Sequence, residues 1–188
     1  MSQTYQRSCF CGAVEVTVTG EPVAAGFCHC ASCRSWGAAP VNAFSLWKPE
    51  AGKITTGEDS VGVYHKTEKS YRKFCNICGG HLLTDHPPFG LIDVHAATIP
   101  TFHHEPKLHV HYGETVLRIT EGLPKMRDMP KEMGGSGETL PEQPASRREE
   151  TRPSAVGHYE TIPVMKSTQL EGAVSPGTAS LSAWICFA

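Results

Sequence analysis

The cysteines are the residues of this sequence best suited to chemistry. The chain has eight of them, and Cys28, Cys30 and Cys33 stand within six residues of one another. Thiols this close together cannot all pair with one another, so a cluster of thiolates around one soft metal ion explains them better than a set of disulfides does. Zinc is the first metal that we expect there.

Four further cysteines form two pairs, Cys9 with Cys11 and Cys75 with Cys78. Each pair lies in a predicted short turn and is followed by glycine, which allows backbone N–H groups to point at the sulfur atoms. We therefore expect these four thiolates to surround one zinc ion. A closed shell of four protein ligands is typical of structural zinc.

The ligand count predicts an open site at Cys28, Cys30 and Cys33. Two closed tetrahedral sites need eight protein ligands, whereas seven cysteines are clustered. The three-cysteine site would leave its fourth position to water, hydroxide or an incoming thiolate, as catalytic zinc does. Two alternatives remain at this point: a histidine closes this site, or the chain binds one zinc ion only.

Two residues beside the three-cysteine motif are candidates for contacts to a substrate. His29 stands between two predicted ligands, where we expect it to support the metal rather than to bind it. It could shuttle a proton, and Arg34 could contact a substrate carboxylate, although a structural role fits each equally well. His109 and His111 would share one face of a strand. This placement is compatible with a metal-binding pair. Because no third ligand has matching spacing, we expect both to be solvent-facing strand residues.

The elements that must position these residues are predicted to be strands. Val14, Val16 and Val18 alternate with polar residues within residues 12–20, which predicts a half-buried strand. The residues from Arg34 to Pro40 suit a short helical turn or loop. We expect a mainly β fold with the metal-binding turns at strand ends. Further strands are predicted at residues 24–28, 41–46, 53–57, 60–65, 70–75, 79–84 and 90–97.

Charge and hydropathy exclude several classes of partner. The formal net charge is −2, and no run of lysine or arginine occurs that would favour nucleic acid. No stretch approaches the ~18 to 20 consecutive apolar residues of a membrane span, and the first residues lack the apolar core of a signal peptide. We therefore expect a cytoplasmic protein that binds neither nucleic acid nor membrane.

Composition divides the chain at about residue 133. With 188 residues, the chain is long enough for one domain and an appendage. Residues 1–133 hold every clustered cysteine and form the predicted zinc-binding domain. Residues 134–188 are rich in proline and show no apolar period, so we expect an irregular, disordered tail. Cys186 lies in this tail, has no cysteine neighbour, and is interpreted as a bystander.

The three cysteine motifs, in this order, resemble those of the glutathione-dependent formaldehyde-activating enzyme family, which also contains centromere protein V. The resemblance covers roughly residues 5 to 126 and includes Gly122-Leu123-Pro124, which is similar to the closing motif of that family. Two positions depart from the family pattern: Phe10 stands where histidine is common, and residues 116–119 lack a tryptophan. The motifs are Cys9-x-Cys11-Gly12, Cys28-His29-Cys30-x-x-Cys33-Arg34 and Phe74-Cys75-x-x-Cys78-Gly79.

The resemblance implies both a fold and a reaction. The fold is a small zinc-bound domain of folded-over antiparallel sheets, called a β-tent. The implied ligand sets are those reached above, with structural zinc at the two cysteine pairs and catalytic zinc at the three-cysteine motif. The implied activity is that of a carbon–sulfur lyase, whose partners are a small thiol such as glutathione and a small aldehyde such as formaldehyde, with S-(hydroxymethyl)glutathione as the product.

Two hypotheses from other classes compete with the lyase. The first is a binding module in which zinc only holds the fold, as the chromatin-associated relative suggests. The second is a methionine sulfoxide reductase, which has a similar fold and a zinc ion held by two cysteine pairs. That chemistry requires a reactive cysteine outside the metal sites, and Cys186 is the one available.

Overall fold

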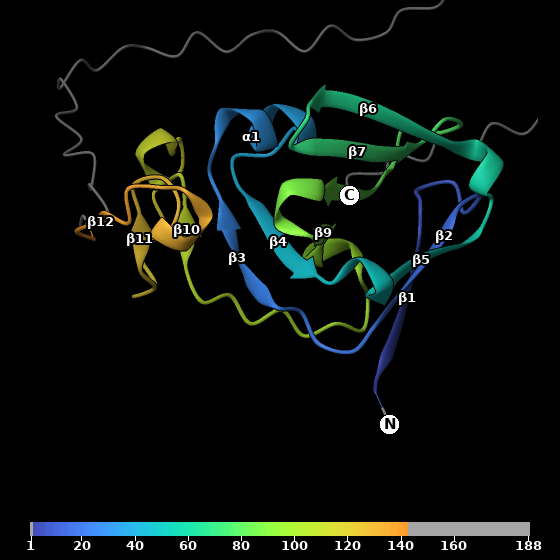
Figure 1. The fold of residues 1–188 in the computed structure, drawn as a ribbon, viewed down its shortest axis with the longest axis horizontal. Helices are drawn as coiled ribbons and strands as arrows, with labels where there is room; N and C mark the ends of the chain where they lie inside the picture. The colour runs from blue at the N-terminus through green and yellow to red at the C-terminus, as the bar shows by residue number, and fades with distance from the viewer. Residues whose placement is uncertain (1, 143–188) are drawn as a thin grey trace, which may run out of the picture. The chain divides into compact units, whose positions relative to one another are not determined.

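The computed structural model describes residues 2–142, which are built mainly from β-strands (Figure 1). This confirms the predicted fold class, and residues 143–188, with Cys186, lie outside the described part. The strands are β1 (Thr4–Ser8), β2 (Glu15–Thr19), β3 (Ala24–Cys28), β4 (Asn42–Trp47), β5 (Gly52–Thr56), β6 (Val61–Thr67), β7 (Ser70–Cys75), β8 (His81–His86), β9 (Leu91–His95), β10 (His109–Val110), β11 (Lys125–Met126) and β12 (Thr139–Leu140).

Short helices connect several of these strands. The α-helix is α1 (Ala31–Gly37), between β3 and β4. The 3-10 helices are η1 (Pro49–Ala51), η2 (Glu58–Ser60), η3 (Pro87–Phe89), η4 (Ala96–Thr98), η5 (Tyr112–Glu114) and η6 (Lys131–Met133).

The larger sheet has nine strands in the order β12-β11-β10-β3-β4-β9-β8-β7-β6. Neighbouring strands from β3 to β6 are antiparallel, whereas β10 runs parallel to both β3 and β11. The larger sheet is therefore antiparallel except at β10, where it is mixed. A parallel pair needs a long connection, and the chain between β9 and β10 is long enough to bring β10 beside β3 in the parallel direction.

The smaller sheet, in the order β1-β2-β5, packs against the larger one and encloses the core. Val14, Val16 and Val18 have no exposed surface, as their alternation predicted. They lie in one apolar cluster with Trp47 of β4 and Ile92 of β9. The core thus joins the N-terminal strands to the centre of the larger sheet, and it fixes the two loops that carry the cysteine pairs.

Strand β1 was missed by sequence reasoning because one of its inward-facing residues is charged. Tyr5 and Arg7 are both buried, and they alternate with exposed residues. The Arg7 guanidinium donates hydrogen bonds to the backbone carbonyls of His81 and Leu82 in β8. These bonds tie the start of the chain to the strand that follows Cys78.

Helix α1 begins earlier than predicted, so that Cys33 lies inside it rather than before it. Cys30 is the N-cap, and its sulfur accepts a hydrogen bond from the backbone N–H of Cys33 at 3.2 Å. Thiolate is not among the usual capping groups, and a cap of this kind gives no familiar sequence signal. The helix ends at Gly37, and its C-cap Ala38 has a left-handed φ of 48°.

The described strands continue past the expected boundary at Met133. Strand β12 pairs with β11 in antiparallel register, Lys125 opposite Leu140. Beyond β12, Glu142 accepts a hydrogen bond from the Lys125 side chain at 2.8 Å. Residues 134–142 therefore contribute to the edge of the larger sheet.

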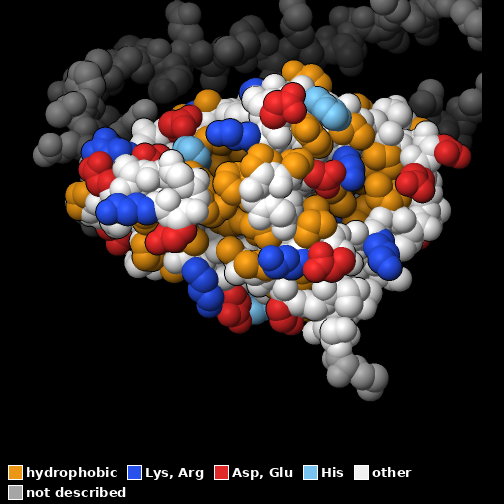
Figure 2. All heavy atoms as spheres, in the orientation of Figure 1, with side chains coloured by type: hydrophobic (Ala, Val, Ile, Leu, Met, Phe, Trp, Pro, Cys, Tyr) orange, Lys and Arg blue, Asp and Glu red, His pale blue; other side chains and the backbone are white. Residues whose placement is uncertain are grey.

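Surface charge in the described part is mixed. On the face shown in Figure 2, acidic and basic side chains are interspersed, and no single sign covers it. Within residues 2–142, no helix has the length and apolar character needed to cross a membrane.

Candidate metal centre

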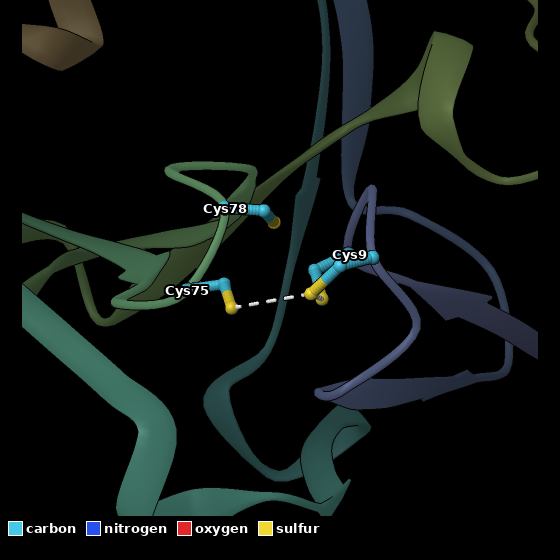
Figure 3. A group of neighbouring side chains, drawn as sticks. Cys9, Cys75 and Cys78 are labelled. Carbon is cyan, nitrogen blue, oxygen red and sulfur yellow. Dashed lines mark hydrogen bonds between the residues drawn. The ribbon is translucent and has the colours of Figure 1, made fainter. Parts of the chain in front are cut away.

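Two loops bring the four paired cysteines together. Cys9 and Cys11 follow β1, and Cys75 and Cys78 lie in the turn between β7 and β8. Their sulfur atoms all lie within 4.8 Å of one another, and those of Cys9, Cys75 and Cys78 converge in Figure 3. The sulfur–sulfur distance is 3.6 Å from Cys9 to Cys11 and 4.0 Å from Cys11 to Cys75. Four sulfurs at about 2.3 Å from a tetrahedral zinc ion stand about 3.8 Å apart, so this donor set fits zinc.

Backbone N–H groups support these sulfur atoms, as the glycines in the motifs predicted. Val14 donates to the Cys9 sulfur at 3.3 Å, and Gly80 donates to the Cys78 sulfur at 3.4 Å. Hydrogen bonds from the backbone of Gly80 and Cys11 lower the pKa of Cys78 to about 6. Donors of this kind stabilise thiolate, which is the form that binds a metal.

The other three clustered cysteines form a second site at the end of β3. The sulfur atoms of Cys28, Cys30 and Cys33 lie within 4.8 Å of one another. Hydrogen bonds from Cys28 and Cys33 lower the pKa of Cys30 to about 2, and the same contacts raise the pKa of Cys28. This cluster has the donor set of a soft metal ion such as zinc.

A fourth protein ligand is absent from the three-cysteine site within residues 2–142. No histidine, aspartate, glutamate or further cysteine of this part places a ligand atom within 4.8 Å of all three sulfurs. The walls near the cluster are apolar, with Phe44 and Val110 packed against Cys28 and with Met129 at the edge. The two cysteine clusters can thus hold metal ions, and they differ in their number of protein ligands.

The ring of His29 lies behind the three-cysteine site and has no exposed surface. Its Nε2 is 2.7 Å from Nδ1 of His109, and its Nδ1 is 2.9 Å from the hydroxyl of Thr115. Burial and the nearby His109 lower the pKa of His29 to about 4. The neutral ring therefore holds the backbone between Cys28 and Cys30 through two hydrogen bonds.

His109 was expected to face solvent, and this was wrong. Its side chain is fully buried, and its Nε2 lies 3.0 Å from the Glu121 carboxylate. His111 does not share its face, because β10 ends at Val110 and His111 adopts a left-handed φ of 53°. No local pattern indicates the role of His109, because its partner His29 is 80 residues away.

The buried hydrogen bonds continue from Glu121 to the end of the described chain. The Lys125 ammonium is 1% exposed and lies 2.8 Å from carboxylate oxygens of both Glu121 and Glu142. The Glu121 carboxylate only accepts, so His109 donates to it from Nε2, while the Thr115 hydroxyl beside His29 donates to the backbone carbonyl of Leu117. The network thus fixes the orientation of both rings.

Arg34 lies on α1, and its Nε donates to the backbone carbonyl of His29 at 3.0 Å. The side chain is partly exposed, and its other guanidinium nitrogens have no hydrogen-bond partner among the described residues. The structure therefore brings Arg34 to the three-cysteine site, with part of its guanidinium available for a ligand.

One face of the larger sheet lies beside α1, and it was not predicted to contribute to the three-cysteine site. Cross-strand pairing places Tyr64, Arg72, Thr84 and Asp93 opposite one another on neighbouring strands, and hence on one face. Trp36 of α1 covers part of this face. Figure 1 shows α1 beside β6 and β7.

The Trp36 ring stacks on the His81 ring at a centroid distance of 4.3 Å. Its centroid is 5.2 Å from the Arg72 guanidinium carbon. These residues lie up to 45 positions apart in the sequence, so their proximity has no local signal.

Comparison with protein families matches residues 4–114 to the family described as glutathione-dependent formaldehyde-activating enzyme. A curated relative from Schizosaccharomyces pombe, named an uncharacterized lyase, is 33% identical over 76 residues. That match covers 40% of this chain and 53% of the relative, so the chain spans about half the length of the curated relative.

Among solved structures, a crystal structure of a Rhodobacter sphaeroides protein matches with a TM-score of 0.44 and 21% sequence identity. The match covers 52% of this chain and 90% of that chain.

Proposed function

Because the chain belongs to the glutathione-dependent formaldehyde-activating enzyme family, we propose that it is a zinc-dependent carbon–sulfur lyase that acts on the adduct of a thiol and a small aldehyde. The reaction that the family name suggests is the combination of glutathione with formaldehyde to give S-(hydroxymethyl)glutathione. The lyase name of the S. pombe relative agrees with this class of reaction.

The observation that carries the proposal is the difference between the two cysteine clusters. Four sulfurs make a closed set, whereas Cys28, Cys30 and Cys33 have no fourth ligand within residues 2–142. A zinc ion held by these three would supply a Lewis acid position at which a substrate thiol stays ionised at neutral pH. A purely structural site would be expected to close with a fourth protein ligand.

The surrounding residues of the chain would hold this site in shape. Cys30 caps α1 and keeps its sulfur fixed relative to Cys33. His29 anchors the backbone between Cys28 and Cys30, since its buried ring is bonded on both sides. Arg34 is the proposed contact for a substrate carboxylate, because part of its guanidinium has no partner among the described residues.

The proposed reaction balances without an outside oxidant or reductant. The substrate loses its S–H proton, its sulfur forms a bond to the carbonyl carbon, and the carbonyl oxygen takes up a proton. The reverse direction cleaves the carbon–sulfur bond. The chain contributes proximity and a fixed, water-poor wall beside the reacting sulfur, because Phe44 and Val110 pack against Cys28.

The test is the exchange rate between free and thiol-bound formaldehyde, measured by exchange NMR with labelled formaldehyde and glutathione. The zinc-loaded chain should accelerate the exchange above the spontaneous rate, and Cys30→Ser should abolish the acceleration. A chain that carries two zinc ions and gives no acceleration with any small thiol would be a non-catalytic binding module instead. Native mass measurement provides the zinc count, and mild chelation should remove the three-cysteine equivalent first.

A further inference from the structure

Arg72 of β7 is a buried cation with little compensation. The residue is 6% exposed, and its guanidinium makes no ion pair among the residues that the structure describes. Its Nε is buried and has no hydrogen-bond partner within residues 2–142. Burial of a charge without a partner is costly, so a nearby negative charge is expected.

The other buried cations are better satisfied. Lys125 pairs with two carboxylates. Arg7 also has an Nε without a partner among the described residues, but its two terminal nitrogens each donate to a backbone carbonyl. In the described part of the chain, the Arg72 side chain makes one hydrogen bond, from Nη2 to the hydroxyl of Ser32 at 3.0 Å. This contrast marks Arg72 as the cation whose environment is incomplete.

The nearest acidic residue on the same face is only a weak candidate for the missing charge. Asp93 lies two strands away, with Thr84 directly between it and Arg72 in the register. Burial raises the pKa of Asp93 to about 7, against the hydrogen bond from Ser45 and the charge of Arg72. Its carboxyl is therefore only partly ionised at neutral pH.

The histidines of this face, His81 and His95, cannot supply the missing negative charge, because an imidazole ring is either neutral or positively charged. Burial lowers the pKa of His95 to about 4, and burial together with the charge of Arg72 lowers that of His81. Both rings are neutral near pH 7.

The strongest source of negative charge near Arg72 is the three-cysteine site. Ser32, which accepts its hydrogen bond, lies in α1 between Cys30 and Cys33. Cys28 lies on the same face of the sheet as Arg72. Cys28 opposes Asn42 of β4, and the pairing of β4 with β9, of β9 with β8 and of β8 with β7 continues this face to Arg72. Three thiolates around a divalent ion leave one net negative charge, and a bound thiolate substrate makes it two.

We propose that Arg72 is a positioning residue of the three-cysteine site, which holds α1 through Ser32 and Trp36 and supplies the positive charge that lets the site accept an anionic sulfur ligand. This inference rests on the proposed function, and it adds the reason why the open position selects a thiolate over a neutral ligand. Arg72 does not touch the reacting atoms. It acts through the charge that it places beside the three sulfurs.

The test measures ligand selectivity rather than activity. In the cobalt-substituted protein, a thiol that joins the three-cysteine site adds a thiolate-to-cobalt absorption band, and the closed four-cysteine site does not respond. 2-Mercaptoethanol serves as the anionic ligand, because only its sulfur carries charge, and imidazole serves as the neutral one. The ratio of their dissociation constants reports the charge beside the open position.

Arg72→Met should weaken 2-mercaptoethanol binding about tenfold or more and should leave imidazole binding within about threefold. Arg72→Lys keeps the charge and should restore most of the ratio. The control is Lys73→Met, which removes a positive charge from the same strand on the opposite face, where Lys73 pairs with Asp85. This control should bind both ligands as the wild-type protein does.

A second variant keeps the inference testable if Arg72→Met fails to fold. Thr84→Asp retains the arginine and gives it a carboxylate directly across the strand pair. It should lower the thiol-to-imidazole ratio as Arg72→Met does, whereas the neutral Thr84→Asn should not.

Two outcomes separate this inference from the proposed function. A wild-type protein that loads cobalt in both clusters and binds no thiol would overturn the proposed function. The role of Arg72 alone would be overturned if the wild-type protein binds thiol and Arg72→Met or Thr84→Asp binds it equally well. The same conclusion would follow if a variant weakened the binding of thiol and imidazole alike.

Discussion

Individual cysteines differ in what their loss should cost the protein. Cys75 has no exposed surface and belongs to the apolar core between the two sheets. Cys30 is partly exposed and caps a helix of seven residues. Because metal binding at a closed site adds to folding free energy, the two sulfurs should not be equivalent.

We predict that Cys75→Ser lowers the melting temperature strongly or prevents soluble expression, whereas Cys30→Ser leaves a folded domain that has lost one metal equivalent. Circular dichroism during heating and metal analysis of the purified variants measure both effects. Equal destabilisation by the two substitutions would mean that both clusters are structural.

Asp93 should make stability depend on pH. Its pKa in the folded protein is raised to about 7 from an ordinary value of 3.8, chiefly by burial. The folded state therefore binds this proton more tightly than the unfolded state, so its contribution is fully present below about pH 4 and is lost as the pH rises through 7. Asp93→Asn should raise the melting temperature at pH 8 by several degrees and should change it much less at pH 5.

Both proteins are compared in the metal-loaded form at each pH. Any release of metal at low pH then affects the variant and the wild type alike. Asp59→Asn, in the exposed 3-10 helix η2, provides the control and should show no such pH dependence. A difference between Asp93→Asn and wild type that grows toward low pH would contradict the assignment.

At the scale of elements, strand β3 delivers the three-cysteine motif and depends on a close approach at Gly26. A Cβ at this position would meet the backbone oxygen of Leu108 at 2.5 Å and the ring of Phe44 at 2.7 Å. The backbone oxygen cannot move away without shifting the connection into β10. The strand therefore requires glycine here, two residues before Cys28.

We predict that Gly26→Ala destabilises the fold by about 1–3 kcal/mol, the usual range for overpacking, and weakens metal binding at the three-cysteine site more than at the four-cysteine site. Urea unfolding and chelator competition measure the two effects. Gly113→Ala is the milder control, since the nearest atom to its Cβ would be the Arg127 carbonyl oxygen at 3.1 Å. An unchanged affinity at the three-cysteine site would show that β3 adjusts without moving Cys28.

At the scale of the whole molecule, the boundary of the predicted zinc-binding domain decides how much of the chain is needed for folding and metal binding. The sequence places that boundary at Met133, where the composition changes. The structure adds β12 to the edge of the larger sheet and pairs Glu142 with the buried ammonium of Lys125. Residues 134–142 therefore complete the network that holds His109.

We predict that a chain ending at Glu142 folds and retains both metal ions, and that a chain ending at Met133 is less stable because Lys125 loses one of its two carboxylates. Thermal unfolding and the metal content of both chains provide the measurement. Glu142→Gln in the longer chain isolates the ion pair from the loss of β12. Equal stability of the two truncated chains would support the boundary at Met133, and loss of metal from both would show that residues beyond 142 are required.

The sequence by itself determined the two cysteine clusters, the mainly β fold and the family. Metal-ligand spacing is set by the local geometry of a turn, so Cys9-x-Cys11 or Cys75-x-x-Cys78 carries its signal within a few residues. The alternation in β2 is equally local, since it follows from the two-residue repeat of a strand. These predictions needed no knowledge of distant contacts.

Only the tertiary structure decided what surrounds the clusters. His109 meets His29 across 80 positions, and Arg72 meets Ser32 across 40. Pairing between distant strands sets such contacts, and a histidine or arginine in isolation is more often exposed than buried. The burial of His109 follows from β10 lying parallel to β3, and the burial of Arg72, without an ion pair among the described residues, follows from α1 packing on the sheet. No periodicity in the sequence encodes either arrangement.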